Sequence, residues 1–441
     1  MTIALLTAIS SRAVYIDNTS PRHDANGKLM DIHDGNLVQW EAGGRYYWYG
    51  IGYRDCALER IYMPPQYCVG VYQPFGGCGF REDHALNVYS SSDLVQWTFE
   101  GDALPFDSRP GGIYFRPKVI FDARSSEYVL WINYLRQSSK DSWPATSPLQ
   151  SYMSNISIVV AKASTPAGPF TVVNPWAELQ IANVGDFALL ATSDAAYIAY
   201  DAWDNGHRVR IERLNDAWTA SAMVLGPEGT TGDLTAADVE APILFERGGW
   251  FYLVYGSTCC FCAEGGAAEV MVARHPLGPW THTGIDINAR RSNGCGRPVP
   301  SQNNFVAQVA TSSGEVEYIF MADLWTTAPD GLKSHDLQYW APLSFDDTAA
   351  PPSIQPLEWR DGVEIDVATA APGAAAPLVP TGTFRTGSAL AKIRQNQASC
   401  THSGTFEAWL LCVIGACFAA LIAVCVRCCC RCCAKRSIIT L

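Results

Sequence analysis

Five copies of a two-strand unit constrain the fold of this 441-residue chain more than any other feature. In each copy a polar residue precedes an apolar strand, and an aromatic strand returns after a turn. In residues 239–255, for example, Glu240 leads the apolar run and Gly248 and Gly249 turn the chain. The other copies begin with these polar residues, 11 to 16 positions before their aromatic strands: Asp34, Arg116, Asp186 and Gln302. Such repeats without intervening helical patterns predict an all-β fold, a five-bladed β-propeller over residues 13–367 in which residues 353–367 supply the closing strand.

The predicted propeller also indicates where a functional site would lie. The innermost strands of all blades line one central channel, so the five leading polar residues should converge there. Three carboxylates, a guanidinium and an amide in one funnel indicate a functional site, although any single one could simply hydrate the channel mouth. A formal net charge of −12, with no basic stripe in the first 400 residues, argues against a nucleic-acid partner.

The C-terminal part of the chain predicts a membrane anchor. Residues 408–426 are apolar and uncharged, long enough to span roughly 28 Å as a helix. We therefore expect an Ala/Pro-rich linker at 368–406, a transmembrane helix at 407–427 and a Cys/Arg-rich tail at 428–441. Basic residues follow the helix, which places the tail in the cytoplasm and the propeller outside the cell or in a lumen.

The cysteines and two glycosylation triplets agree with export. The tail cysteines suggest S-palmitoylation, with metal binding as the weaker alternative. Eight further cysteines before residue 401 are expected mainly in disulfides. The Cys-rich residues 259–262 lack a His-rich partner segment, so no metal site is predicted. Asn18 and Asn155 begin Asn-X-Ser/Thr triplets, which identify the exported part as a candidate glycoprotein.

Several motifs resemble those of one enzyme family. They are residues 46–50 (YYWYG), 89–97 (YSSSDLVQW), 116–120 (RPKVI), 168–170 (GPF), 240–242 (EAP), 278–280 (GPW) and 301–304 (SQNN). Together they resemble glycoside hydrolase family 43 over residues 13–367, most of all its galactan 1,3-β-galactosidase branch. The resemblance implies a five-bladed propeller that hydrolyses glycosidic bonds with inversion. It also implies an Asp base, an Asp that tunes the acid and a Glu acid, which correspond to Asp34, Asp186 and Glu240.

The chemistry explains why carboxyl groups are needed. A glycosidic oxygen leaves when it is protonated, so Glu240 must hold its proton near neutral pH, and repulsion from Asp186 would help it do so. An inverting enzyme also needs a base with room for water, roughly 6.5–9.5 Å from the acid. In the galactosidase branch a Gly tends to replace the base Asp, and a Gln on the last blade is implicated in activating water. This chain has both Asp34 and Gln302, so either could activate the water.

Other residues bear on the choice of sugar. Ile51 and Phe115 stand where the galactosidase branch tends to have Glu, which separates this chain from a typical β-1,3-galactan enzyme. Candidate substrate-binding residues are His33, Trp48, Arg116, Tyr134 and Trp325. The aromatic ones could instead pack between blades, and His33 could make an ordinary hydrogen bond.

Two classes of function follow from these residues. The first is a membrane-anchored glycosidase that needs no cofactor and acts on an extracellular or cell-wall oligo- or polysaccharide. An arabinofuranosidase or xylosidase is an alternative specificity within this class. The second is a propeller that binds glycans without cleaving them.

Overall fold

The computed structural model describes residues 10–54, 83–136, 155–257, 264–292 and 296–369, and these form a five-bladed β-propeller. The first blade contains β2 (His33–Gln39), β3 (Tyr46–Gly52), β4 (Ala85–Ser91) and β5 (Thr98–Asp102). The second contains β6 (Gly112–Asp122), β7 (Glu127–Arg136), β8 (Ile156–Ala163) and β9 (Thr171–Ala177). The third contains β10 (Val184–Ala191), β11 (Ala196–Ala202), β12 (Arg210–Arg213) and β13 (Thr230–Asp233).

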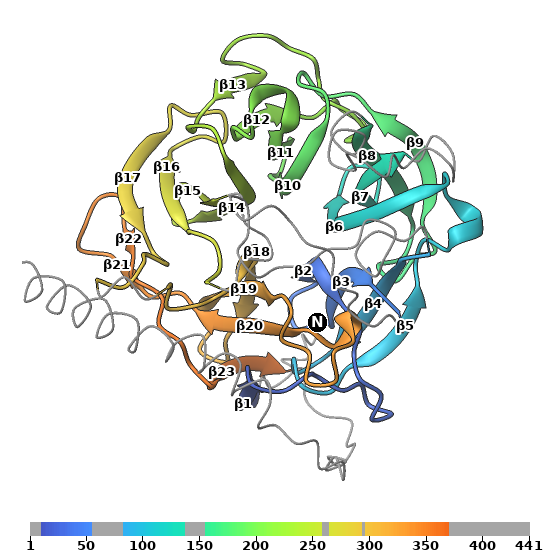
Figure 1. The fold of residues 1–441 in the computed structure, drawn as a ribbon, viewed down its shortest axis with the longest axis vertical. Coiled ribbons are helices and arrows are strands. Elements are labelled where there is room, and N and C mark those ends of the chain that lie inside the picture. Colours follow the sequence, from blue (N-terminus) through green and yellow to red (C-terminus); the bar gives the residue numbers. More distant parts are fainter. Residues whose placement is uncertain (1–9, 55–82, 137–154, 258–263, 293–295, 370–441) are drawn as a thin grey trace, which may run out of the picture.

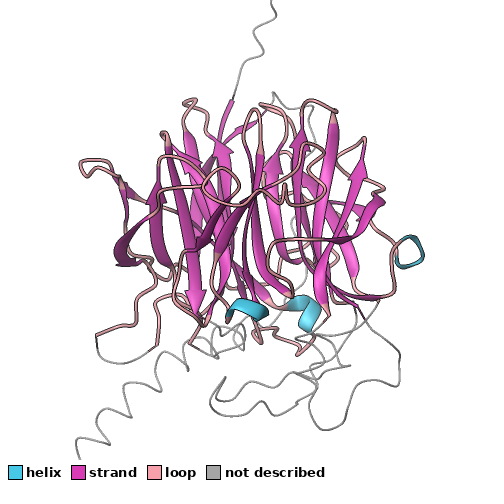
Figure 2. Ribbon diagram, turned by 90° about the horizontal axis from the view of Figure 1, so that it is seen from above, coloured by secondary structure: helices cyan, strands magenta, loops and turns pink. Residues whose placement is uncertain are grey.

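The last two blades complete the ring. The fourth contains β14 (Val239–Arg247), β15 (Trp250–Ser257), β16 (Glu269–Ala273) and β17 (Thr281–Asp286). The fifth contains β18 (Gln302–Ala310), β19 (Val316–Leu324) and β20 (Leu337–Pro342). A short hairpin and three single-turn helices lie between blades or strands: β21 (Phe345–Asp346), β22 (Ser353–Ile354), η1 (Phe106–Ser108), η2 (Trp203–Asn205) and η3 (Lys333–His335). The strands β2, β6, β10, β14 and β18 surround the centre (Figure 1), and Figure 2 shows the strands side-on.

The burial of each strand follows from its place in a blade. All seven residues of β4 and of β11 are buried, because neighbouring blades cover both faces of these middle strands. The outer strands β5 and β9 keep several residues exposed. A propeller therefore needs continuous apolar and aromatic runs near its axis, and the aromatic return strands of the repeats provide them.

The first and last described strands close the ring. Strand β1 (Ser10–Asp17) pairs antiparallel with β23 (Gly362–Thr369), with Ile16 opposite Val363, and the pair lies beside β20 of the fifth blade (Figure 1). The predicted closing segment 353–367 thus contains β22 and most of β23. The pairing with β1 was not anticipated, because no local pattern links segments about 350 residues apart.

The structure corrects the glycosylation prediction at one of the two triplets. Asn18 is fully buried, and its side-chain amide exchanges hydrogen bonds with the backbone of Trp340, at 3.0 Å from both the carbonyl oxygen and the amide nitrogen. A glycan cannot be attached there without removing that contact, so Asn18 is a structural residue. Asn155 is half-buried.

The predicted anchor lies outside the described part of the chain. Residues 370–441 include the expected transmembrane helix and the Cys tail, and all cysteines before residue 401 also fall outside it. Within the described ranges, no helix is long and apolar enough to cross a bilayer.

Trp48 is a core residue and is withdrawn from the substrate-binding set. Only 1% of it is exposed, and its ring lies 5.5 Å from the ring of Trp97 and 4.8 Å from that of Trp340. The assignment failed because an aromatic strand looks the same in sequence whether its rings face a neighbouring blade or the channel.

Trp48→Ala should lower the free energy of unfolding by about 3–5 kcal/mol, because it leaves a cavity between two packed indoles. Trp48→Phe, which fills part of that space, should cost less. Calorimetric unfolding of the purified proteins measures both effects. A stable Trp48→Ala protein that has lost only ligand binding would return this residue to the substrate-binding set.

Candidate active site

A β-bulge in each innermost strand places the five leading polar residues. The strand registers shift between residues 33 and 36, 115 and 118, 184 and 187, 240 and 243, and 303 and 305. Each polar residue lies within or directly beside its shift, and Asp34 (φ 60°), Arg116 (φ 44°) and Ala241 (φ 55°) have left-handed backbones. A bulge redirects a side chain that a regular strand would point into the blade. This explains how five strands built for burial present polar groups at the axis.

Glycine is required beside one bulge. At Gly35 a Cβ atom would lie 1.4 Å from the carbonyl oxygen of Tyr49 on the neighbouring strand. Only glycine permits this approach of β2 to β3, so Asp34 depends on the residue that follows it.

Arg116 joins two of the carboxylates. Its Nε is 2.6 Å from Asp186 Oδ1, and a terminal guanidinium nitrogen is 3.7 Å from Asp34 Oδ1. The Arg116 and Asp34 side chains are 3% and 7% exposed, whereas Asp186 is 23% exposed. The predicted substrate-binding Arg116 is therefore mainly a bridge between acidic groups.

Gln302 joins the third carboxyl group to the second. Its Nε2 donates to Glu240 Oε1 at 3.0 Å and to Asp186 Oδ2 at 3.3 Å, and its Oε1 accepts from the indole of Trp325 at 2.9 Å. The backbone N–H of Ala241 also donates to Asp186 Oδ2, at 3.1 Å. The structure thus brings all four predicted catalytic residues together, with Trp325 in direct contact.

Burial shifts the proton affinity of two of these carboxyls. Burial, aided by the charges of Asp186 and Asp201, raises the pKa of Glu240 well above its ordinary value of 4.5. Burial also raises the pKa of Asp34 to about 6, against the opposing charge of Arg116. A proton donor near neutral pH and a second carboxyl that ionises near pH 6 are compatible with paired acid–base work.

Lys118 joins three blades of the propeller beside this site. Its Nζ donates to the carbonyl oxygens of Asp34 at 2.9 Å and Gly35 at 2.6 Å, and to Asn304 Oδ1 at 2.7 Å. Burial lowers its pKa to about 7. One side chain from blade two thereby ties blades one and five at the level of the bulges.

Asp323, like Lys118, was missed by the sequence analysis. It lies opposite Gln302 on β19, and its Oδ2 accepts the backbone N–H of Asp34 at 3.2 Å. A signal was available, because a polar residue interrupts the apolar run near the C-terminal end of three aromatic return strands: Asn133, Asp201 and Asp323.

His33 and Tyr53 form a layer around Asp34. The Tyr53 hydroxyl is 3.4 Å from Asp34 Oδ2, and His33 Nδ1 is 3.5 Å from Asp323 Oδ1. Lys333 lies 3.7 Å from the centre of the Trp325 ring. His33 is 1% exposed, so it supports the site and has no surface to offer a ligand.

Tyr134 does not join the site. It is 2% exposed, its hydroxyl donates to the Gly111 carbonyl at 2.9 Å, and its ring packs 5.1 Å from that of Tyr114. It is therefore withdrawn from the substrate-binding set as a packing residue, for the same reason as Trp48.

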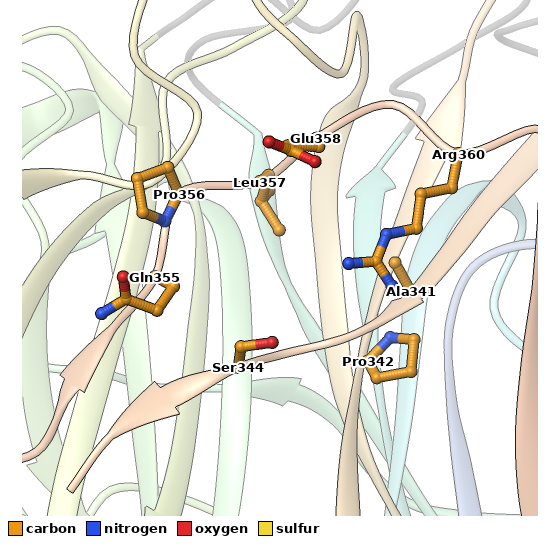
Figure 3. Close-up of a pocket in the computed structure, with 8 residues that line it drawn as sticks. All are labelled: Ala341, Pro342, Ser344, Gln355, Pro356, Leu357, Glu358 and Arg360. Carbon is orange, nitrogen blue, oxygen red and sulfur yellow. The ribbon is translucent and has the colours of Figure 1, made fainter.

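A small pocket lies away from the centre. Its lining comes from the end of β20 and the segment around β22 (Figure 3): Ala341, Pro342, Ser344, Gln355, Pro356, Leu357, Glu358 and Arg360. Its volume of about 20 Å³ suits a water molecule and is too small for a sugar. Among the residues that the structure describes, no group of three or more His, Cys, Asp or Glu side chains could hold a metal ion.

Comparison with protein families gives one match. The sequence profile of glycosyl hydrolases family 43 matches residues 76–363, well over half of the chain. No curated protein matches the sequence.

Solved structures share the fold. A family 43 β-1,3-galactosidase superposes with a TM-score of 0.58 at 19% identity, over 80% of this chain and 64% of its own. An exo-β-1,3-galactanase from Clostridium thermocellum gives 0.58 at 22% identity, over 81% and 67%. One from Phanerochaete chrysosporium, crystallised with β-1,3-galactotriose, gives 0.56 at 22% identity, over 82% and 71%. This chain therefore spans just under two thirds of the galactosidase.

Proposed function

The chain belongs to family 43 of the glycosyl hydrolases, and from this premise we propose that the site at the axis of its propeller hydrolyses glycosidic bonds of an oligo- or polysaccharide with inversion. One observation carries the proposal. The half-buried Glu240 lies beside Asp186 and is joined to it through the Gln302 amide, at the axis of the propeller. A carboxyl that keeps its proton near neutral pH is what protonation of a leaving-group oxygen requires.

In this mechanism Glu240 donates its proton to the glycosidic oxygen as the bond to the anomeric carbon breaks. Asp186 keeps negative charge near Glu240, which favours the protonated acid before the reaction. Gln302 holds Glu240 in position through its amide. Trp325 in turn holds Gln302.

Asp34 is the better candidate for activating water. Its Oδ1 is buried and has no hydrogen-bond donor among the described residues, and a guanidinium nitrogen of Arg116 lies 3.7 Å from it. This oxygen is the atom that we expect to accept the proton from water. Gln302 is less suited to this role, because its Nε2 donates to the carboxyl groups of Asp186 and Glu240 and its Oε1 already accepts from Trp325. A neutral amide is also a much weaker base than a carboxylate.

The proposed substrate class follows from the solved structures that share the fold and from two positions, 51 and 115, at which this chain has no carboxylate. The solved structures are named as β-1,3-galactosidases and exo-β-1,3-galactanases, so β-1,3-galactan is the first substrate to test. Phe115 is half-buried next to Arg116, and Ile51 is fully buried, so this chain presents no carboxylate at either position. A sugar with fewer hydroxyls on that side would suit this site better, so arabinofuranosides and xylosides should be tested alongside β-1,3-galactan.

Glu240→Gln should lower hydrolysis of a natural linkage by at least the roughly 10²–10⁴-fold typical of general acid catalysis. An aryl glycoside with an activated leaving group needs less protonation and should lose less. Steady-state rates on both substrates measure the difference. If the wild-type protein binds glycans but cleaves none, and Glu240→Gln binds equally well, the protein is a glycan receptor.

Asp34→Asn should impair both substrates, because attack by water is common to them. The wild-type rate should also fall as the pH drops through about 6, where the carboxylate of Asp34 takes up a proton. Gln302→Ala should reduce the rate less than Asp34→Asn. A nearly silent Asp34→Asn together with a severe Gln302→Ala would transfer the water-activating role to Gln302.

We also propose that residues 407–427 anchor the enzyme as a single-pass protein with the propeller outside or in a lumen. The support is the uncharged run 408–426 followed by basic residues. Five cysteines would then lie at the cytoplasmic membrane face, within reach of S-palmitoylation: Cys428, Cys429, Cys430, Cys432 and Cys433.

Protease added to intact cells should digest the propeller of a cell-surface protein and leave a C-terminal epitope tag intact. Immunoblots for the two ends of the protein measure this, with detergent-permeabilised cells as the control in which both are digested. In vesicles from internal membranes the propeller should be protected instead. In intact cells, a tag that is digested while the propeller is protected would reverse the orientation.

A further inference from the structure

The polar atoms of Asp34, with the exception of Oδ1, form hydrogen bonds within the described part of the chain. Its backbone N–H donates to Asp323 Oδ2 at 3.2 Å, and its carbonyl oxygen accepts from Lys118 Nζ at 2.9 Å. Its Oδ2 accepts from the hydroxyl of Tyr53 at 3.4 Å. The proposed base is therefore held by side chains that have no part in the proposed mechanism.

The ammonium group of Lys118 contacts two of the bulged strands at once. On β2 its Nζ lies 2.9 Å from the carbonyl oxygen of Asp34 and 2.6 Å from that of Gly35. On β18 it lies 2.7 Å from Asn304 Oδ1 and 3.2 Å from the Asn304 carbonyl oxygen. Asn304 follows Gln302 by two residues. One side chain of β6 thus fixes the strands that carry both candidates for activating water.

This set of contacts requires Lys118 to be protonated. All four neighbouring atoms are oxygen acceptors, and an ammonium group has three N–H donors for them. A neutral amine has one N–H fewer and would turn its lone pair toward an oxygen. Burial lowers the pKa of Lys118 to about 7, so the ammonium form still predominates near pH 6, where Asp34 titrates. A positive charge therefore lies beside Asp34 while its carboxyl group ionises.

Tyr53 is fixed with its hydroxyl directed at the carboxylate of Asp34. Its ring centre lies 4.8 Å from that of His84 and 5.5 Å from that of His33, and its backbone N–H donates to Asp31 Oδ1 at 2.8 Å. Burial raises the pKa of the phenol well above 10. The hydroxyl therefore keeps its proton and can donate it in a hydrogen bond to ionised Asp34.

Other titratable groups around Asp34 set the background on which these two residues act. They come from five elements: His33 from β2, Arg116 from β6, Asp186 from β10, Asp323 from β19 and Lys333 from η3. Burial raises the pKa of Asp34 against the opposing charge of Arg116. Removing a further cation or a hydrogen-bond donor from this carboxylate should raise its pKa again.

We propose that Lys118 and Tyr53 are positioning residues for Asp34: Lys118 fixes its backbone and Tyr53 fixes its Oδ2, so that Oδ1 is directed at the attacking water. The proposal rests on the proposed role of Asp34 as the base. Lys118 and Tyr53 are 1% and 3% exposed, so neither has a surface to offer the sugar. Their loss should therefore impair turnover and leave substrate binding nearly unchanged.

The test uses Lys118→Met and Tyr53→Phe in the full chain. Methionine has a similar length without the charge or the donors, and phenylalanine lacks only the hydroxyl. Lys118→Met should lower kcat roughly 10–10²-fold, because a small displacement of a catalytic group costs that much. Its KM should stay within about twofold, and the acidic limb of kcat should move up by about one pH unit. Tyr53→Phe should shift both quantities in the same directions by less, since a neutral donor is lost.

Two matched controls remove the same groups away from the axis. Lys162→Met removes an ammonium group that donates to Glu127 Oε2 at 2.8 Å, on β8 of the same blade as Lys118. Tyr252→Phe removes a hydroxyl that donates to the carbonyl oxygen of Pro352 at 2.9 Å, near the turn of the β14–β15 hairpin. Neither control should change kcat or its acidic limb.

A second measurement separates this proposal from the proposed function. Carboxyl ¹³C NMR of aspartate-labelled protein, with the Asp34 signal assigned through Asp34→Asn, follows the titration of Asp34 and needs no substrate. A wild-type protein that cleaves nothing would overturn the proposed reaction and still allow this titration. If Lys118→Met does not fold, Lys118→Gln replaces it, because its amide keeps two N–H donors without the charge. If neither folds, Tyr53→Phe decides alone.

A raised titration of Asp34 and a lower kcat at nearly constant KM in both variants, with neither change in the controls, support the proposal. A change in only one variant overturns the role of the other residue. Folded variants with an unchanged Asp34 titration and kcat overturn the proposal, and lower thermal stability alone would show that the two residues only support the fold. A raised KM with unchanged kcat would also overturn it, by assigning them to substrate binding.

Discussion

The guanidinium of Arg116, shared between Asp186 and Asp34, is the interaction on which the centre of this propeller depends. Three acidic side chains converge at the axis, and two of them are in contact with this one buried cation. Removing charges from water costs several kcal/mol per ion, and the cost is recovered only when each charge has a well-placed partner. Without Arg116 the two aspartates would repel each other at low exposure, and protonation or rearrangement would follow. Arg116 therefore allows the bulged strands to hold Asp34 and Asp186 close together at the axis.

A propeller can hold these groups in place because its blades are also joined by polar side chains near the axis. Asn36 exchanges hydrogen bonds with the backbone of Val119 on the next blade, and Asn133 donates to the carbonyls of Val184 and Gly185. Lys118 ties a third pair of blades at the same level. Apolar packing between blades tolerates small sliding motions, whereas a buried hydrogen bond has a narrow range of distances and angles. These contacts thus fix the relative height of strands that belong to different sheets.

Chemically similar side chains acquire different tasks here through their surroundings. Asp186 accepts hydrogen bonds or a charge contact from Arg116, Gln302 and the Ala241 backbone, whereas Glu240 has Gln302. Asp34 keeps one oxygen without a donor. A well-solvated or well-bonded carboxylate is poorly suited to donate a proton, and a buried, sparsely bonded carboxyl is well suited to it. This distribution of partners supports the roles proposed for Glu240 as the acid and Asp34 as the base.

The sequence by itself determined the fold and the composition of the central ring. The spacing of the repeats, the turn residues and the aromatic return strands are local sequence patterns, and a propeller repeats one such pattern in every blade. The leading residues of all five units could therefore be aligned from the sequence alone. Which aromatic residues face the channel was not determined. Trp48, Tyr134 and Trp325 all stand in or just after similar strands, but only Trp325 contacts Gln302, because blade packing and a bulge decide where each ring points. The partners of Asp34, the closure of β1 on β23 and the proximity of Asp201 to Gly185 also came only from the tertiary structure. These contacts join segments that are distant in sequence, and their geometry depends on how neighbouring blades or strands stack, which no local pattern encodes.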